Sequence, residues 1–268
     1  MYGPHTNERL VGGAISGRRE EVFLATKFGI RLEPGDPPRR SVDGSPGYVR
    51  SACEASLTRL GVEHIDLYYQ HRVDPNTPIE ETVGALEQAV RSGKALYAGI
   101  SNYDVAQTQA ALQALRALRV PCLLHQMPYS MFRRTAEEGL FATLVENGVG
   151  AIAFSPLAQG LLTDRYLSGI PADSRAGKPG RSLSAADLTS ARREQMRALA
   201  AIAAGRGQSL AQLALAWVLR HPGMTSALVG ASHVDQLEDS LAALNNLGFE
   251  AAELAQIDRI LSVEGCCT

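Results

Sequence analysis

The chain has 268 residues, of which 45% are hydrophobic and 20% are charged, and these are ordinary values for a soluble globular protein. This composition excludes a disordered, collagen-like or coiled-coil chain, and the length allows one large domain or two small ones. Lysine plus arginine number 26 and aspartate plus glutamate number 28, so the formal net charge is −2 and no basic block predicts a nucleic-acid surface.

The cysteines and the N-terminal residues indicate the cellular compartment of the protein. The four cysteines are few for this length and show neither the CxxC nor the Cys/His spacing of a metal site, which favours a reducing cytoplasm. The opening sequence MYGPHTNERL lacks the basic and apolar regions of a signal peptide. No apolar run approaches the roughly 18 residues of a membrane-spanning helix. We therefore expect a cytoplasmic protein with neither a membrane nor a nucleic-acid partner.

Short apolar segments rich in β-branched and aromatic residues recur along the chain and predict six strands. They cover residues 21–27, 64–70, 95–101, 122–126, 150–155 and 226–230. The longer segments between and after them predict helices over 48–60, 78–91, 105–118, 137–146, 191–204, 210–219 and 234–244. In the first of these helices Val49, Cys53 and Leu57 share one face, so Cys53 is expected in the core.

This alternation of strand and helix predicts a parallel sheet covered by helices, because nearly continuous apolar strands are buried on both faces. An open nucleotide-binding sheet usually carries GxGxxG after a strand, and a phosphate-cleaving one carries GxxxxGK[ST]; neither motif is present. A closed barrel is favoured by elimination. Two stretches rich in glycine, proline and arginine, 29–47 and 169–182, are predicted to be loops.

Polar residues close or directly follow five of the predicted strands in succession, at the end where parallel β/α barrels carry their functional groups. They are Lys27, His71, Ser101 with Asn102, Gln126, and Ser155. Any one of them could be a solvated strand end, but five in succession favour a site.

The same residues carry a family resemblance that covers essentially the whole chain. The motifs are Tyr2-Gly3, Ala25-Thr26-Lys27, Gln70-His71-Arg72-Val73-Asp74, Gly99-Ile100-Ser101-Asn102, Phe154-Ser155-Pro156-Leu157-Ala158-Gln159-Gly160 and Gly230-Ala231-Ser232. In this order they resemble the aldo-keto reductase superfamily, and most closely its bacterial glyceraldehyde-3-phosphate reductase branch, which is related to potassium-channel β-subunits. The resemblance implies an α/β fold of the TIM type, a (β/α)8 barrel, as a single domain over 1–268. It also implies NADPH without a metal, and reduction of small aldehydes or ketones such as methylglyoxal or glyceraldehyde-3-phosphate.

The resemblance assigns the chemistry to Tyr2, Lys27 and His71. Hydride arriving at a carbonyl carbon leaves an alkoxide, and a phenol with a pKa near 10 is a slow proton donor at neutral pH unless a neighbour stabilises its anion. The Lys27 ammonium could do so, since one charge at about 4 Å is worth up to about 3 pKa units before desolvation. His71 would donate a hydrogen bond to the carbonyl oxygen. A histidine at a strand end is also often a purely structural residue.

The resemblance further assigns residues to the cofactor. Ser101, Asn102 and Gln126 would hold the nicotinamide carboxamide, and Phe154 would stack on the nicotinamide ring. Ser155, Leu157 and Gln159 would line the pyrophosphate. The adenosine phosphate site would comprise Gly230, Ser232, His233, Gln236 and Asp239, with Arg165 and Arg175 supplying positive charge that many relatives place at position 233. A helix N-terminus suits a phosphate, although a serine before a helix is more commonly a plain N-cap.

The resemblance is incomplete at its start. The family's catalytic aspartate, which precedes the tyrosine, is absent, and only six of the eight barrel strands are predicted; the first strand, the first helix and most of the second strand are missing. We hypothesise that Met1 is an internal methionine of a longer protein, or that the chain is a shortened gene product. The alternatives to an active reductase are a catalytically silent NADPH-binding regulatory or interaction subunit, an inactive truncated product, and an enzyme that oxidises alcohols. The sequence leaves homo-oligomer formation open.

Overall fold

The computed structural model describes residues 5–33, 35, 39–171, 174, 176–177, 183 and 185–262. Tyr2, Arg175 and the cysteines at 266 and 267 lie outside these residues. Contacts group the chain into two compact units, the first comprising Met1–Met127 and Gly139–Ala151 and the second Pro128–Glu138 and Ile152–Thr268. That residues 1–268 form a single domain stays a prediction.

Six strands form the main sheet and follow the chain order β1-β4-β5-β6-β7-β8. They are β1 (Ala25–Phe28), β4 (Ile65–Gln70), β5 (Ala95–Ser101), β6 (Cys122–Pro128), β7 (Gly150–Phe154) and β8 (Met224–Ala227). The pairs β1–β4, β4–β5 and β5–β6 are parallel. The six predicted strands are confirmed with bounds shifted by a few residues, and β1 and β8 stand at the two ends of the sheet order.

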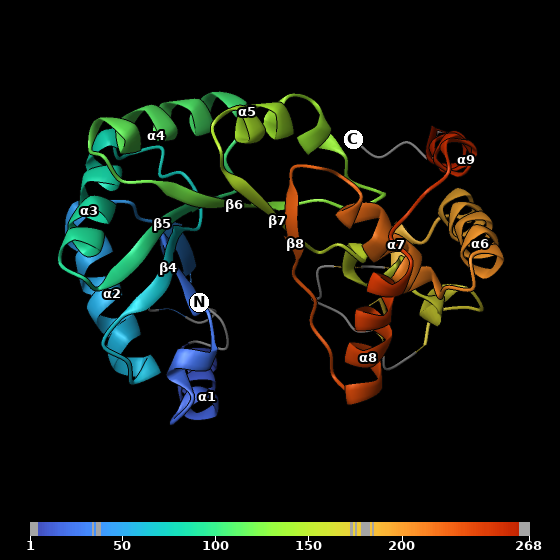
Figure 1. Cartoon of the computed structure of the whole chain (residues 1–268). Helices are drawn as coiled ribbons and strands as arrows, with labels where there is room; N and C mark the ends of the chain where they lie inside the picture. Colours follow the sequence, from blue (N-terminus) through green and yellow to red (C-terminus); the bar gives the residue numbers. More distant parts are fainter. Residues whose placement is uncertain are drawn as a thin grey trace. The chain divides into compact units, whose positions relative to one another are not determined.

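Helices of the first unit cover one face of its strands (Figure 1). They are α2 (Pro46–Leu60), α3 (Ile79–Arg91) and α4 (Val105–Ala117), with α5 (Leu140–Glu146) later in the chain. Pro46 starts α2 and the left-handed Gly61 ends it, while a capping box between Asp104 and Gln107 starts α4. Cys53 is 1% exposed, so its predicted core position is confirmed.

Residues 29–47, which the sequence predicts to be a loop, instead contain an antiparallel hairpin. Strands β2 (Ile30–Glu33) and β3 (Arg39–Val42) pair with each other as a separate two-stranded sheet, and Arg31 forms an ion pair with Asp43 across it. A further unpredicted element, α1 (Thr6–Ile15), packs against α2. The Glu8 carboxylate of α1 accepts hydrogen bonds from Thr26 of β1 and Arg59 of α2, which anchors the helix.

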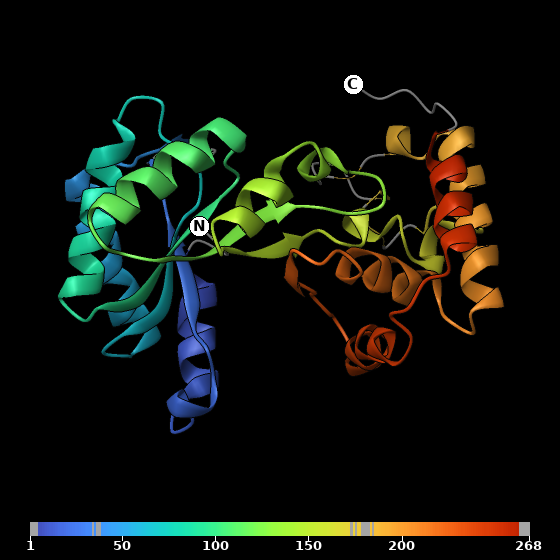
Figure 2. The same ribbon diagram turned by 45° about the horizontal axis from the view of Figure 1, so that its top comes forward.

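The second unit contains α6 (Ser190–Gly205), α7 (Leu210–Leu219), α8 (Val234–Ala242) and α9 (Ala251–Ser262). Helices α6 and α9 lie side by side (Figure 2), and α7 is buried on almost every side. The predicted helix over 137–146 begins only at Leu140, because Gly139 has a φ of 101° that helical backbone excludes. Short 3₁₀ turns cover Arg19–Glu21, Thr135–Glu137, Ala158–Gly160, Asp164–Tyr166, Ala185–Asp187 and Ala243–Asn245.

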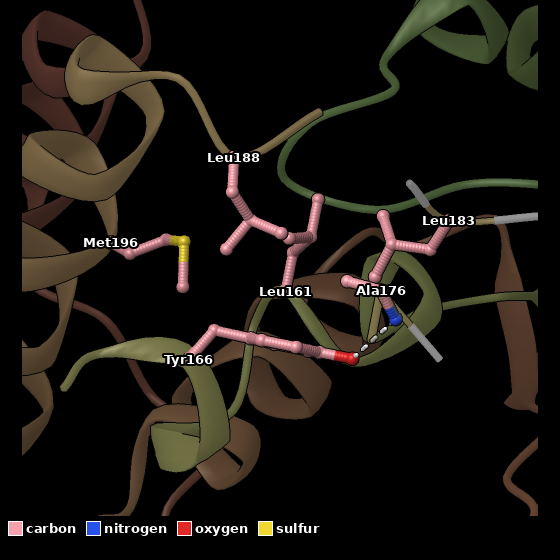
Figure 3. Close-up of a cluster of buried hydrophobic side chains, with 6 residues drawn as sticks. All are labelled: Leu161, Tyr166, Ala176, Leu183, Leu188 and Met196. Carbon is pink, nitrogen blue, oxygen red and sulfur yellow. Dashed lines mark hydrogen bonds between the residues drawn. The ribbon is translucent and has the colours of Figure 1, made fainter. Parts of the chain in front are cut away.

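A local hydrophobic cluster supports the chain that follows β7 (Figure 3). Its buried members are Leu161, Tyr166, Ala176, Leu183, Leu188 and Met196. The Tyr166 hydroxyl accepts a hydrogen bond from the Ala176 backbone N–H at 3.5 Å. The cluster connects α6 to the segment after β7 and so fixes the loop that carries several predicted cofactor residues.

Candidate active site

Strand β1 places Lys27 in a pocket of about 400 Å³ within the first unit. Alternation along the strand separates the side chains: Thr26 turns to Glu8 of α1, whereas Lys27 lies on the opposite face, in register with Tyr69 of β4. Burial lowers the pKa of the Lys27 ammonium to about 8. The lysine therefore remains mostly protonated at neutral pH but exchanges its proton much more readily than an exposed lysine.

His71 lines the same pocket directly after β4. Its backbone N–H donates to the Phe28 carbonyl oxygen at 2.9 Å, which fixes its position beside the end of β1. Burial, and then the charges of Lys27 and Arg72, lower the pKa of the imidazole to about 4. His71 is consequently neutral at physiological pH and keeps one N–H that can donate to a carbonyl oxygen. The structure thus brings Lys27 and His71 together, while Tyr2 lies outside the described residues.

The carboxyl ends of β5 and β6 bring Ser101, Asn102 and Gln126 together next to His71. The Asn102 backbone N–H donates to the Gln126 carbonyl oxygen at 3.0 Å, and its side-chain amide donates to the Ser101 hydroxyl and to the His71 carbonyl oxygen, both at 3.0 Å. Asn102 has a φ of 59°, a left-handed conformation that asparagine tolerates better than most residues. Such backbone strain is concentrated at functional sites.

Most of the other predicted cofactor residues line one pocket of about 660 Å³ in the second unit. They are Ser155, Leu157, Gln159, Arg165, Gly230, Ser232, Gln236 and Asp239. Ser155 and Gln159 have φ values of 54° and 63°, so this loop too departs from ordinary backbone. Phe154 instead lines a neighbouring pocket of about 390 Å³. Ser155 and Gln159 line both this pocket and the pocket of about 660 Å³.

The start of α8 forms one wall of the larger pocket. Its N-cap is His233, not Ser232, and no side chain caps the helix, so the first N–H groups of α8 are not bonded by a capping side chain. Ser232 donates its own backbone N–H to the Gln236 side chain at 2.9 Å. Hydroxyls, amides and a helix N-terminus suit the phosphates of a dinucleotide, so the residues present fit such a cofactor.

The carboxylate of Asp239, besides lining the pocket, forms hydrogen bonds that the sequence did not predict. It accepts hydrogen bonds from the Ser209 hydroxyl at 3.1 Å and from the Gln212 side chain at 2.7 Å. Ser209 and Gln212 form the capping box that begins α7. The carboxylate therefore stabilises the junction of α7 and α8 as well as lining the pocket.

Sequence reasoning missed the hairpin residues Ile30, Arg31 and Leu32, which line the lysine pocket. No local signal separates them from an ordinary loop. It also missed Tyr69, whose place opposite Lys27 follows from the register of β1 and β4 in the structure.

Neither a metal centre nor a membrane helix is found in the described residues. No group of three or more histidine, cysteine, aspartate or glutamate side chains there could hold a metal ion. Among the described helices, none combines the length and apolar character that crossing a membrane requires.

Parallel strands that alternate with helices, with a lysine and a neutral histidine at the strand ends, are the arrangement found in β/α-barrel enzymes. The sequence profile of the Aldo/keto reductase family matches residues 1–262. The chain is 48% identical to L-glyceraldehyde 3-phosphate reductase of Escherichia coli K12, over 96% of this chain and 77% of that protein. The O157:H7 protein of the same name matches equally.

Solved structures agree with this assignment. An aldo-keto reductase from Bacillus halodurans, in its holo form, superposes with a TM-score of 0.79 at 30% identity, over 99% of this chain and 82% of that one. The thermostable aldo-keto reductase Tm1743, in complex with epalrestat, has a TM-score of 0.74 at 26% identity, over 97% of this chain and 79% of that one. The chain belongs to the aldo/keto reductase family and is an oxidoreductase of the nicotinamide-dependent type, and its fold is the family's TIM-type barrel, with six strands of the main sheet described.

Proposed function

We propose that the protein reduces a small aldehyde or ketone to an alcohol with NADPH, and that its substrates are of the glyceraldehyde-3-phosphate or methylglyoxal type. The observation that carries this proposal is the shared pocket of Lys27 and His71, one cationic and one neutral at pH 7. The names of the Escherichia coli relatives support the substrate class. When bound, NADPH supplies a hydride to the carbonyl carbon.

The residues of the chain would then manage the proton and the developing negative charge. Tyr2 is the proposed proton donor to the carbonyl oxygen, and the Lys27 ammonium stabilises the phenolate that the transfer leaves behind. His71 donates an N–H hydrogen bond to the same oxygen and orients it. The proposed carboxamide contacts are Ser101, Asn102 and Gln126, and Phe154 is the proposed stacking partner of the nicotinamide.

The remaining cofactor contacts are proposed for the second unit. Its larger pocket would hold the pyrophosphate through Ser155, Leu157 and Gln159, and the adenosine phosphates near Gly230 and the start of α8. Ser232, Gln236 and Arg165 line that pocket, and His233 is the N-cap of α8. His233 is proposed as a further phosphate contact, and Arg175 as an additional cation. Asp239 is assigned a supporting role, because its carboxylate is bonded to Ser209 and Gln212.

We propose a cytoplasmic location and a small carbonyl compound as the partner. Cys53 and Cys122 are free and buried, and burial raises the pKa of their thiols to about 11 and about 12, as expected of unreactive core residues.

Absorbance of NADPH during incubation with methylglyoxal and with glyceraldehyde-3-phosphate tests the proposal. We expect turnover that Tyr2→Phe and Lys27→Met each reduce about a hundredfold or more. Lys94→Met is the matched control, since Lys94 pairs with Glu54 away from the pocket, and it should retain activity. Binding of NADPH without turnover of either substrate would reject the enzyme in favour of a silent cofactor-binding subunit.

A further inference from the structure

Tyr69 lies directly beside Lys27 on the neighbouring parallel strand. The two residues are register partners of β1 and β4. Their sequence neighbours point to the other face of the sheet: Thr26 bonds to Glu8 of α1, and the Tyr68 hydroxyl donates to the Val49 carbonyl oxygen of α2. Lys27 and Tyr69 therefore share the face turned away from these helices.

The contact between the two side chains involves the ring of Tyr69. The Lys27 Nζ lies 5.3 Å from the ring centroid, within the range of a cation–π interaction. Tyr69 is 2% exposed, and its hydroxyl has no hydrogen-bond partner within the described part of the chain. An unsatisfied buried hydroxyl is a net cost, so any favourable contribution of Tyr69 at this position comes from its ring and not from its polar group.

Gly99 of β5 provides the space for this ring. Tyr69 and Gly99 are register partners, and a Cβ atom at position 99 would lie 2.6 Å from the Tyr69 Cδ1 atom. Any side chain at position 99 would therefore displace the ring from its place beside Lys27. Three adjacent strands thus combine to set one aromatic face against one ammonium group.

The pocket that Lys27 lines also contains charged and titratable groups from the elements around it. They are His5, which is the N-cap of α1, Glu8 of α1, Arg31 of the hairpin, Tyr48 and Arg59 of α2, and His71 after β4. Glu8 is engaged by Thr26 and Arg59, and Arg31 by Asp43. The ring of Tyr69 is a described group that favours the charged form of the lysine.

We propose that Tyr69 is a positioning residue that acts through Lys27: its ring face holds the ammonium protonated and in place, and Gly99 keeps the ring there. The inference rests on the proposed function and deepens it, since it names a residue that acts on the charge of the lysine in the proposed site. Its test, however, measures the pKa of Lys27 directly and requires no enzymatic turnover.

Competitive acetylation of the intact protein with acetic anhydride across a pH series, read by mass spectrometry, measures the pKa of Lys27. Lys94, in the same sample, is the internal reference. We expect Tyr69→Phe to leave the Lys27 midpoint in place, because the ring remains. Tyr69→Leu should lower it by about one pH unit, the tenfold change that corresponds to a desolvated cation–π contact. An unchanged midpoint in Tyr69→Leu, or an equal fall in Tyr69→Phe, would overturn the proposal.

A second series covers the case in which the leucine variant does not fold. Phenylalanine with one, two or three ring fluorines at position 69 preserves shape while it progressively weakens the negative face of the ring. The Lys27 midpoint should fall with each fluorine, and a flat series rejects the proposal. The pH profile of kcat should move in parallel in an active enzyme. If the wild-type chain has no turnover, the proposed function fails, whereas the labelling result still decides the role of Tyr69.

Discussion

The side-chain amide of Asn102 donates a hydrogen bond to the backbone carbonyl oxygen of His71 at 3.0 Å, although the two residues are 31 positions apart. A residue proposed to hold the cofactor thereby fixes the backbone of a residue proposed to contact the substrate. Because Asn102 also bonds to Gln126 and adopts a left-handed backbone, its side chain and its conformation can be tested separately.

We predict that Asn102→Gly and Asn102→Ala differ in their free energy of unfolding but raise KM for NADPH to a similar extent. Both lose the bonds to Ser101 and His71, so both should raise KM for NADPH several-fold. Alanine also incurs a left-handed backbone penalty of about 1 kcal/mol, which urea unfolding would detect. The matched pair is Arg119→Gly and Arg119→Ala at an exposed residue with a φ of 58°, where stability should differ similarly and kinetics should not change. Equal stability of the two Asn102 variants would contradict the assignment.

Lys27→Met should stabilise the protein while it removes activity. Burial lowers the folded-state pKa of the lysine to about 8 from 10.5, so a charged Lys27 is destabilising at neutral pH. We expect the free energy of unfolding of the variant at pH 7 to exceed that of the wild type by about 3 kcal/mol. Between pH 8 and about 10.5 the unfolded chain binds more protons than the folded one, so wild-type stability rises and the difference shrinks. Urea unfolding of both proteins from pH 7 to 10 checks this, and a difference independent of pH would argue against it.

We predict that His71 lowers the free energy of unfolding at acidic pH, between about 6.5 and 4. Its pKa is lowered from 6.5 to about 4 in the folded protein, mainly by burial. Above pH 6.5 the imidazole is neutral in both states and contributes nothing to the pH dependence. As pH falls from 6.5 to 4 the unfolded chain takes up the proton first, so the wild type loses stability relative to His71→Gln. Titration of the imidazole by NMR gives the midpoint independently, and a midpoint near 6.5 would be incompatible with the buried site.

Ser232 and Asp239 line one pocket, and we predict opposite consequences of changing them. Ser232→Ala should weaken NADPH binding about fivefold, equivalent to one hydrogen bond of about 1 kcal/mol, with little change in unfolding. Asp239→Ala should instead lower the free energy of unfolding by about 1 to 2 kcal/mol, because the Ser209 and Gln212 capping box loses its acceptor. Fluorescence titration with NADPH and urea unfolding of both variants would separate the two roles.

The sequence predicts the six strands of the main sheet and the residues at their ends, because apolar strands followed by polar residues are a local signal. Lys27 and His71 were found in this way, and the structure brings them into one pocket. Tyr69 was not found, since β4 is buried on both faces and shows no alternation that would separate inward from outward side chains.

The hairpin was predicted to be a loop for a different reason. Its two strands pair with each other and do not join the main sheet. Because they contain Arg31, Arg39 and Arg40, they lack the apolar pattern by which a core strand is predicted. For Asp239, resemblance indicated the pocket, but only coordinates reveal its bond to Ser209, 30 positions away.

The hairpin of β2 and β3 closes on its own hydrogen bonds, yet Ile30, Arg31 and Leu32 form part of the wall beside the reactive lysine. The wall of this pocket therefore comes from separable stretches of the chain: the main sheet contributes Lys27, and an appended ribbon that follows β1 contributes Ile30, Arg31 and Leu32. We predict that exchange of residues 30–42 between homologues changes the preferred carbonyl substrate and leaves Lys27 and His71 in place.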